Sequence, residues 1–226
     1  MAGKNANKRK VKLLAVFFDK NSFRIFVQFL QRPINCRSHQ DAPNMTLNDE
    51  NPNLNQYWYS ERTRETLCTA IRESISLKGG SEARVAFLST PSLYFTLSDE
   101  ERKQCTLLDY DTTLSSQNCK SYVFYDFNYP ASIDANLRGS FDVIVIDPPF
   151  ISPSVWKSYA ITVSLLAKEG AHIICTTVAE NEALLERLFM CQKTNFQPSI
   201  RNLTYQYNTY ANFESSALST TNAELE

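Results

Sequence analysis

Apolar and polar positions along this chain follow two spacings, one helical and one typical of buried strands. Residues 54–75 have apolar side chains at a helical spacing, and the pair Gly79-Gly80 ends that segment. The apolar positions are Leu67, Cys68, Ile71 and Ile75. Short apolar runs of strand length follow at residues 84–88, 105–111, 121–128 and 141–150. The pattern therefore predicts one helix ahead of a sheet of buried strands.

The second half of the chain continues this alternation and then changes. A helix is predicted over residues 155–167, a fifth strand over 171–177 and a further helix over 180–189. Residues 195–213 form two β-like stretches rich in Tyr, Thr and Asn. Strands that alternate with helices indicate parallel βαβ units, and the last stretch predicts an antiparallel terminal hairpin. The fold class is therefore α/β, with a mostly parallel sheet.

The most informative run is FDVIVIDPPF, residues 141–150. The stretch Val143 to Ile146 is apolar and uncharged, as in a strand that is buried on both faces. Pro148 and Pro149 cannot donate to a sheet ladder, so residues 147–150 form a stiff turn. This turn is predicted at the carboxyl end of a strand, where open α/β sheets bind ligands.

The chemistry of that turn suits an amine. The carboxylate of Asp147 and the carbonyl of Pro148 can accept both hydrogens of an amino group and orient its lone pair. Phe150 can lie against the nitrogen that is modified. The competing interpretation is a core strand that is ended by prolines and carries an incidental acid.

Further acids fall at the ends of other predicted strands. Asp109 or Asp111 is positioned to bind a ribose hydroxyl pair, and the residues leave open which of them does so. Asp126 is predicted to accept a hydrogen bond from an adenine amino group, with Phe127 beside the ring. The same acids, taken singly, are compatible with solvated loop positions.

The loop after the first strand, residues 88–94, contains no glycine, which disfavours a pyrophosphate-binding dinucleotide site. Residues 147–150 resemble the [DN]PP[FYW] signature of amino-methyltransferases, which use S-adenosylmethionine, a cofactor without a phosphate. We expect its methionine end to bind hydroxyl groups of this loop and the N–H groups of a helix start with Pro91 in its first turn. The hydroxyls belong to Ser89, Thr90 and Ser92.

These motifs together carry a family resemblance. The segments NQYWYS, RVAFLSTPSLY, LLDYD, FYDFN, FDVIVIDPPFIS and RNLTYQYNTYANFES resemble the eukaryotic lysine methyltransferases that modify elongation factor 1-alpha. That family has also been described as N-6 adenine-specific methyltransferase-like. The match covers residues 53–215. It implies a seven-stranded, Rossmann-like class I methyltransferase fold, S-adenosylmethionine as the methyl donor and a lysine of elongation factor 1-alpha as the acceptor.

The resemblance also assigns roles to positions. Residues 89–94 correspond to the cofactor loop, Asp109 and Asp111 to the ribose end, and Asp126 to the adenine end. Residues 147–150 correspond to the catalytic turn. The resemblance further implies that an aromatic segment lies at the substrate entrance. Its residues are Tyr57, Trp58 and Tyr59.

Charge is distributed unevenly along the chain. Residues 1–40 hold nine Lys and Arg and one acid, which leaves fourteen basic and 23 acidic residues in the rest. We therefore expect a basic extension over residues 1–45 and an acidic methyltransferase domain over 46–226. An acidic surface disfavours nucleic acid as the substrate. The six cysteines and two histidines show no metal-ligand spacing, so we expect no metal site, reduced thiols and a cytoplasmic protein.

Two alternatives remain at this point. An adenine-N-6 methyltransferase that acts on DNA or RNA would use the same DPPF turn, because the turn serves any exocyclic amine. A catalytically inactive methyltransferase-like binding module would retain the fold without turnover. No apolar run approaches the length of a membrane span, so we expect no membrane partner.

Overall fold

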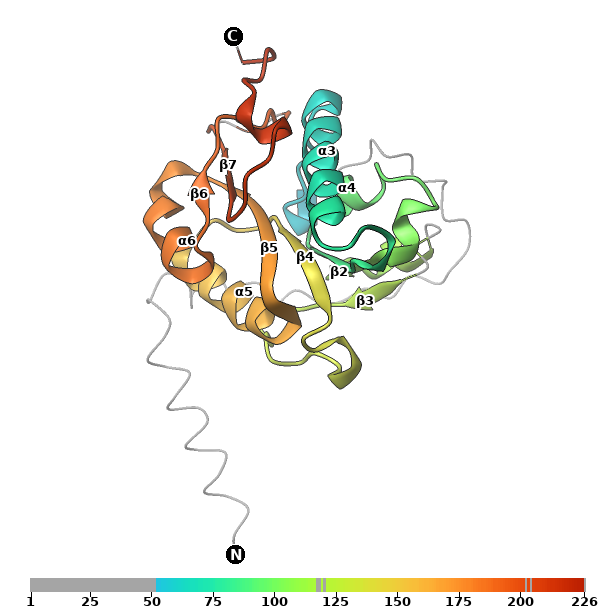
Figure 1. Cartoon of the computed structure of the whole chain (residues 1–226). Coiled ribbons are helices and arrows are strands. Elements are labelled where there is room, and N and C mark those ends of the chain that lie inside the picture. Colours follow the sequence, from blue (N-terminus) through green and yellow to red (C-terminus); the bar gives the residue numbers. More distant parts are fainter. Residues whose placement is uncertain (1–51, 117–118, 120, 202, 204, 226) are drawn as a thin grey trace, which may run out of the picture. The chain divides into compact units, whose positions relative to one another are not determined.

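The structure is a computed structural model that describes residues 52–116, 119, 121–201, 203 and 205–225 (Figure 1). The predicted basic extension over residues 1–45 lies outside the described residues. Seven strands form one sheet in the order β3-β2-β1-β4-β5-β7-β6. The strands are β1 (Val85–Leu88), β2 (Cys105–Asp109), β3 (Tyr122–Phe124), β4 (Phe141–Ile146), β5 (Ala167–Thr177), β6 (Gln192–Lys193) and β7 (Asn208–Ala211).

All strand pairs are parallel except those of β7, which runs antiparallel to both β5 and β6. This mixed seven-stranded sheet confirms the predicted class I methyltransferase fold. The α-helices are α3 (Glu61–Leu77), α4 (Pro91–Tyr94), α5 (Pro153–Leu166) and α6 (Glu182–Phe189). Short 3-10 helices lie at Pro52–Leu54, Gly80–Glu82, Glu101–Gln104, Thr112–Ser116, Ala135–Leu137, Ala179–Asn181 and Ala217–Ser219.

The helices cover both faces of the sheet. On β4, Ile144 and Ile146 pack with α5 and α6, whereas Val143 and Val145 point to the opposite face and pack with α3 and α4. Figure 1 shows the two helix layers on either side of the strands. Because successive side chains of a strand point to opposite faces, a strand buried on both faces must be apolar at every position. Residues 143–146 of β4 are all apolar and buried, and they meet this requirement.

Two helix starts follow from local sequence. Ser60 is the N-cap of α3, and its Oγ accepts a hydrogen bond from the Thr63 backbone N–H at 3.1 Å. Ser152 caps α5 in the same way, and Pro153 occupies the first turn, where its missing N–H costs nothing. Residues 55–59 are therefore excluded from the first helix, which begins later than the periodicity over 54–75 indicates.

The terminal antiparallel pair differs from the sequence-based expectation in its position. Of the two β-like stretches expected within 195–213, the structure forms one as a ladder strand, β7. Its partner β6 lies earlier, at Gln192–Lys193, and β7 inserts between β5 and β6 instead of lying at the edge. The reason is packing: Tyr210 and Ala211 of β7 are buried against β5, so this strand belongs inside the sheet.

Two further expectations concern the cysteine thiols and the absence of membrane spans. The described cysteines are all free, and four of the five are buried: Cys68, Cys105, Cys175 and Cys191. In the described part of the chain, no helix combines the length and the hydropathy of a membrane span.

Candidate active site

The carboxyl ends of the central strands bring the predicted site residues to one edge of the sheet. In the parallel register, Leu88 of β1 lies opposite Leu108 of β2 and Ile146 of β4. Ile146 in turn lies opposite Cys175 of β5. The next residue along each strand therefore stands at the same level. These residues are Ser89, Asp109, Asp147 and Thr176.

Asp147 follows β4 and is held by two hydroxyl side chains. Its Oδ2 accepts a hydrogen bond from the Tyr59 hydroxyl at 2.5 Å, and the Tyr59 oxygen lies 2.6 Å from Oγ1 of Thr176. Burial raises the pKa of Asp147 to about 7, and the hydrogen bond from Tyr59 opposes part of that rise. Near neutral pH this carboxyl group therefore lies close to its titration point.

The rest of the turn leaves one carbonyl and one aromatic ring accessible. Among the described residues, none donates a hydrogen bond to the carbonyl of Pro148, whereas the Asn55 amide donates to the carbonyl of Pro149. Phe150 is 45% exposed, and its ring meets Phe127 edge to face at 6.1 Å between centroids. The turn thus combines a carboxylate, a carbonyl without a protein donor and an accessible aromatic ring.

Asp109 and Asp111 are both buried but differ in their remaining hydrogen-bonding capacity. Both oxygens of Asp111 accept bonds, Oδ1 from Thr113 and Oδ2 from Gln56. Asp109 accepts the Asp111 backbone N–H at 2.8 Å on Oδ1, and no described residue donates to its Oδ2. Burial raises the pKa of Asp109 to about 7, against the backbone N–H groups that lower it. Asp109 is therefore the acid with a free acceptor atom.

The loop after β1 has an unusual backbone and one unsatisfied hydroxyl. Ser89 has a φ of 55°, in the left-handed region that β-carbon-bearing residues rarely adopt, and its Oγ lies 2.6 Å from the Tyr159 hydroxyl. Thr90 is 2% exposed, and no described group bonds its Oγ1. The helix start expected at Pro91 is confirmed, because α4 begins there. The Thr90 hydroxyl precedes that helix but does not cap it.

A single turn is all that α4 forms, so its dipole is small. The N–H groups at its start are correspondingly weak as a site for the methionine carboxylate. Pro91 and Ser92 are both buried. A buried, unbonded hydroxyl is costly unless a ligand satisfies it, so Thr90 is the loop residue whose environment most directly fits a bound polar group.

Asp126 and Phe127 follow β3 and have different neighbours. Oδ1 of Asp126 accepts both the backbone N–H and the side-chain amide of Asn128, which forms a local turn. Phe127 stacks on Tyr159 at 6.2 Å and also contacts Phe150. Phe127 therefore joins the β3 end to the turn after β4, and the adenine role of both residues stays a prediction.

The aromatic segment before α3 is not uniform. Tyr57 is 38% exposed, as expected for a residue at an entrance, whereas Trp58 and Tyr59 are buried. Tyr59 departs from the sequence-based expectation, because its hydroxyl bonds Asp147 instead of facing solvent. The segment leads into α3, where Ser60 must act as the N-cap, and this fixes the preceding residues against the sheet.

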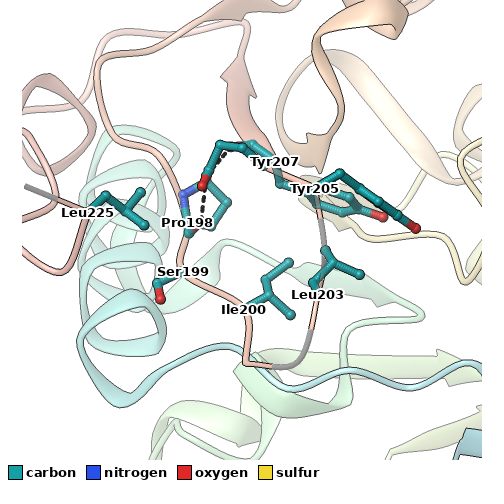
Figure 2. A pocket seen from close by; sticks show the side chains of 8 residues that line it. Pro198, Ser199, Ile200, Leu203, Tyr205, Tyr207 and Leu225 are labelled. Atoms are coloured by element: carbon teal, nitrogen blue, oxygen red, sulfur yellow. Dashed lines mark hydrogen bonds between the residues drawn. The ribbon is translucent and has the colours of Figure 1, made fainter.

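Sequence reasoning missed a pocket beside this segment. A cavity of about 310 Å³ is lined by Pro198, Ser199, Ile200, Leu203, Tyr205, Gln206, Tyr207 and Leu225. Figure 2 shows the rings of Tyr205 and Tyr207 next to each other, and the two stack at 5.9 Å. Among the tyrosines of the Tyr-rich stretch 195–213, Tyr210 is buried in the core, while Tyr205 and Tyr207 line this pocket.

The pocket adjoins Asp147 through two tyrosines. The backbone of Tyr59 forms an antiparallel bridge with Ile200, one of the lining residues. Burial raises the pKa of Tyr207, and the negative charge of Asp147 raises it further, so these two groups are electrostatic neighbours. Nothing local in the sequence marks the pocket, because its lining also includes Leu225, which is far from residues 198–207 in sequence.

Comparisons with known proteins identify the family of this chain. A family model described as "Probable N6-adenine methyltransferase" matches residues 50–215. The chain belongs to this family. It is 33% identical to the EEF1A lysine methyltransferase 1 of Danio rerio, over 74% of this chain and 100% of that protein.

Two other relatives show a similar level of identity. A protein-lysine N-methyltransferase of Caenorhabditis elegans is 30% identical, over 74% of this chain and 79% of the relative. The EEF1A lysine methyltransferase 1 of Homo sapiens is 29% identical, over 77% of this chain and 80% of the relative. The similarity thus spans the β-strand ends described above.

Proposed function

We propose that this protein transfers a methyl group from S-adenosylmethionine to the ε-amine of a lysine of elongation factor 1-alpha. The observation that carries the proposal is the turn after β4, in which Asp147 and the unbonded Pro148 carbonyl lie beside the exposed ring of Phe150. The names of the relatives support lysine as the acceptor. The proposal includes a cytoplasmic location, which the free described cysteines support.

The described residues fit the cofactor. Oδ2 of Asp109 is free to accept a ribose hydroxyl, and the buried hydroxyl of Thr90 lacks the partner that the methionine end would supply. Ser89 and Ser92 flank that hydroxyl, while Asp126 and Phe127 remain assigned to the adenine end. When bound, S-adenosylmethionine supplies an electrophilic methyl group on a positively charged sulfur.

The residues of the turn would prepare the amine. A free lysine has a pKa of about 10.4, so its ε-amine must lose a proton to solvent before it can attack. Burial next to the turn and the positive sulfur favour the neutral form. The Asp147 carboxylate and the Pro148 carbonyl then accept the two amine hydrogens, and the lone pair points at the methyl carbon.

As the nitrogen–carbon bond forms and the sulfur–carbon bond breaks, positive charge moves to the nitrogen. The Asp147 carboxylate stabilises that charge directly. The ring of Phe150 adds a cation–π contribution of about 0.5 to 2 kcal/mol. Asp147 must be ionised for both tasks, which its pKa of about 7 permits from neutral pH upward.

The pocket beside the turn supports a protein acceptor. Its described lining is free of charged side chains and includes two stacked tyrosines. Such a surface accommodates the apolar side chains that neighbour a lysine in a polypeptide. A nucleic-acid substrate would instead require basic groups for its phosphates, and the chain beyond residue 40 has fewer basic than acidic residues.

The test is methyl transfer from tritiated S-adenosylmethionine to purified elongation factor 1-alpha and, separately, to an adenine-containing oligonucleotide. We expect label on a lysine of the factor, and its loss in Asp147→Ala. Asp142→Asn is the matched control, because Asp142 lies at the opposite end of β4.

Each outcome has a definite meaning. Label on the oligonucleotide alone would move the substrate to nucleic acid. An absence of label on both acceptors, with S-adenosylmethionine binding intact by isothermal titration calorimetry, would identify a binding module without activity. Label on the factor that persists in Asp147→Ala would reject the mechanism while keeping the substrate.

A further inference from the structure

Three side chains from distant parts of the sequence meet at the catalytic turn. Tyr59 precedes α3, Asp147 follows β4 and Thr176 lies near the end of β5. The Tyr59 hydroxyl is 2.5 Å from Oδ2 of Asp147 and 2.6 Å from Oγ1 of Thr176. Tyr59 and Thr176 are each 3% exposed, so water does not compete for these bonds.

The direction of these bonds follows from the groups involved. An ionised carboxylate only accepts, so Tyr59 gives its single hydroxyl hydrogen to Asp147. The Tyr59 oxygen then accepts, and Thr176 is the donor in the second bond. Burial, followed by the charge of Asp147, raises the pKa of Tyr59 well above its ordinary value, so this hydroxyl remains a donor throughout the range of an enzyme assay.

Oδ2 of Asp147 thus accepts a hydrogen bond from within the protein. The described residues provide no hydrogen-bond donor for the other oxygen, Oδ1. We propose that Tyr59 is a positioning residue, which fixes the Asp147 carboxylate so that Oδ1 faces the acceptor amine, and that Thr176 holds Tyr59 in place. This inference rests on the proposed function, because it gives Asp147 the role described above.

The electrostatic surroundings make this arrangement consequential. No described basic residue forms an ion pair with Asp147. The titratable groups that interact with it are Tyr59, Tyr159, Cys175 and Tyr207, and burial keeps all four neutral. The hydrogen bond from the Tyr59 hydroxyl is therefore what favours its ionised form.

Tyr59 also connects the turn to the acceptor pocket. Its backbone bridges Ile200, and the N–H of the next residue, Ser60, donates to the Ser199 carbonyl at 2.9 Å. The same residue thus touches the reacting carboxylate with its side chain and the pocket wall with its backbone. Tyr59→Phe removes the first contact and leaves the second, which makes it the informative variant.

The experiment compares Tyr59→Phe and Thr176→Val with the wild-type protein. Tyr210→Phe is the matched control, since Tyr210 is a fully buried tyrosine of the same sheet without a bond to Asp147. The first readout is the titration of the Asp147 carboxyl carbon by NMR in the full chain without cofactor, with the resonance assigned through Asp147→Asn. The second is the pH dependence of kcat and KM for methyl transfer.

We expect Tyr59→Phe to raise the titration midpoint of Asp147 by about one pH unit, because a hydrogen bond to the charged form is lost. The acid limb of the kcat profile should move by the same amount. At pH 7 kcat should fall about fivefold, because the ionised fraction of Asp147 falls from about one half to about one tenth, with recovery at higher pH and little change in KM. Thr176→Val should act in the same direction with a smaller shift, and Tyr210→Phe should leave the midpoint unchanged.

An unchanged Asp147 midpoint in a folded Tyr59→Phe protein would overturn the inference. So would a loss of kcat that is equal at every pH, which indicates a general structural defect. The titration needs no substrate, and this separates the two proposals. A shifted midpoint in a protein without transferase activity would keep the hydrogen-bonded arrangement and reject the proposed function instead.

Discussion

Asp109, which is buried, and Asp147, which is partly buried, lie at the carboxyl ends of β2 and β4, which flank β1 on its two sides. Burial raises the pKa of both to about 7. Their hydrogen-bond donors differ in kind. Asp109 accepts the backbone N–H of Asp111, two residues later, whereas Asp147 accepts the side-chain hydroxyl of Tyr59, which lies 88 positions away in sequence.

The hydrogen bond to Asp109 is therefore a local contact, and the one to Asp147 is a tertiary contact. The donor of Asp109 belongs to its own turn, so it persists whatever side chains surround it. The donor of Asp147 is in place only after the segment before α3 has packed against the sheet. The environment of Asp147 can therefore be altered by a single side-chain substitution, while that of Asp109 cannot.

The largest expected effect comes from removing each acid in turn. Asp147→Ala should lower kcat about a thousandfold with little change in S-adenosylmethionine affinity, because Asp147 acts on the amine. Asp109→Asn should instead weaken S-adenosylmethionine binding roughly 10- to 100-fold, through the loss of charged hydrogen bonds. Calorimetric titration and steady-state kinetics measure the two effects. Equal effects of both variants on S-adenosylmethionine binding and on kcat would contradict the assignment of Asp147 to the amine and Asp109 to the cofactor.

The local part of this comparison could be predicted from sequence. The end of β4 is marked by an apolar run and two prolines, and Asp109 ends a short apolar strand; both signals lie within ten residues. The strand ends converge because parallel strands share one edge. The choice of Asp109 over Asp111 required the structure, since only there are both oxygens of Asp111 seen to be occupied.

The tertiary part could not be predicted. The Tyr59 bonds to Asp147 and Thr176 span 88 and 117 residues, and neighbouring Tyr57 and Trp58 offer the same chemistry in sequence. The pocket around Tyr205 is equally non-local. The position of β6 was also missed, because a strand of two residues carries no periodic signal.

The second prediction tests whether the pocket around Tyr205 serves the protein acceptor, as Asp147 does, and not the cofactor. Tyr205→Ala should raise KM for the protein acceptor about tenfold, since an aromatic contact of roughly 1 kcal/mol or more is lost. Cofactor affinity, which depends on the Asp109 side, should not change. Steady-state kinetics with varied acceptor give the value, with Tyr210→Phe as a control outside the pocket. A matching loss of S-adenosylmethionine affinity would contradict this division.

The third prediction concerns stability against pH. The folded-state pKa of Asp147 is raised from 3.8 to about 7, so between these values the folded protein holds a proton that the unfolded chain releases. The free energy of unfolding therefore falls as pH rises through this window. Asp147→Asn removes that penalty and should raise Tm at pH 8 by about 3 °C for each kcal/mol recovered.

At pH 4 the same variant should show little or no gain, because the wild-type carboxyl is then protonated in the fold. Thermal melts at the two pH values provide the comparison. Asp109→Asn should follow the same trend, since the pKa of Asp109 is raised to a similar value. A stabilisation that is independent of pH would show that charge burial is not its cause.

The smallest effect is expected at the opposite end of β4. Burial raises the pKa of Asp142, but the Arg84 N–H and Lys168 outweigh it and hold this pKa below its ordinary value. Lys168 lies 2.8 Å from the carboxylate and is 43% exposed, so Lys168→Ala should cost less than about 1 kcal/mol. Its stability deficit should shrink between about 0.05 and 0.5 M salt, because the Debye length falls from roughly 14 Å to roughly 4 Å. Methyl transfer should be unaffected, because Asp142 and Lys168 lie at the amino end of β4 and the proposed chemistry takes place at its carboxyl end. A change in kcat would show that the two ends of β4 are coupled.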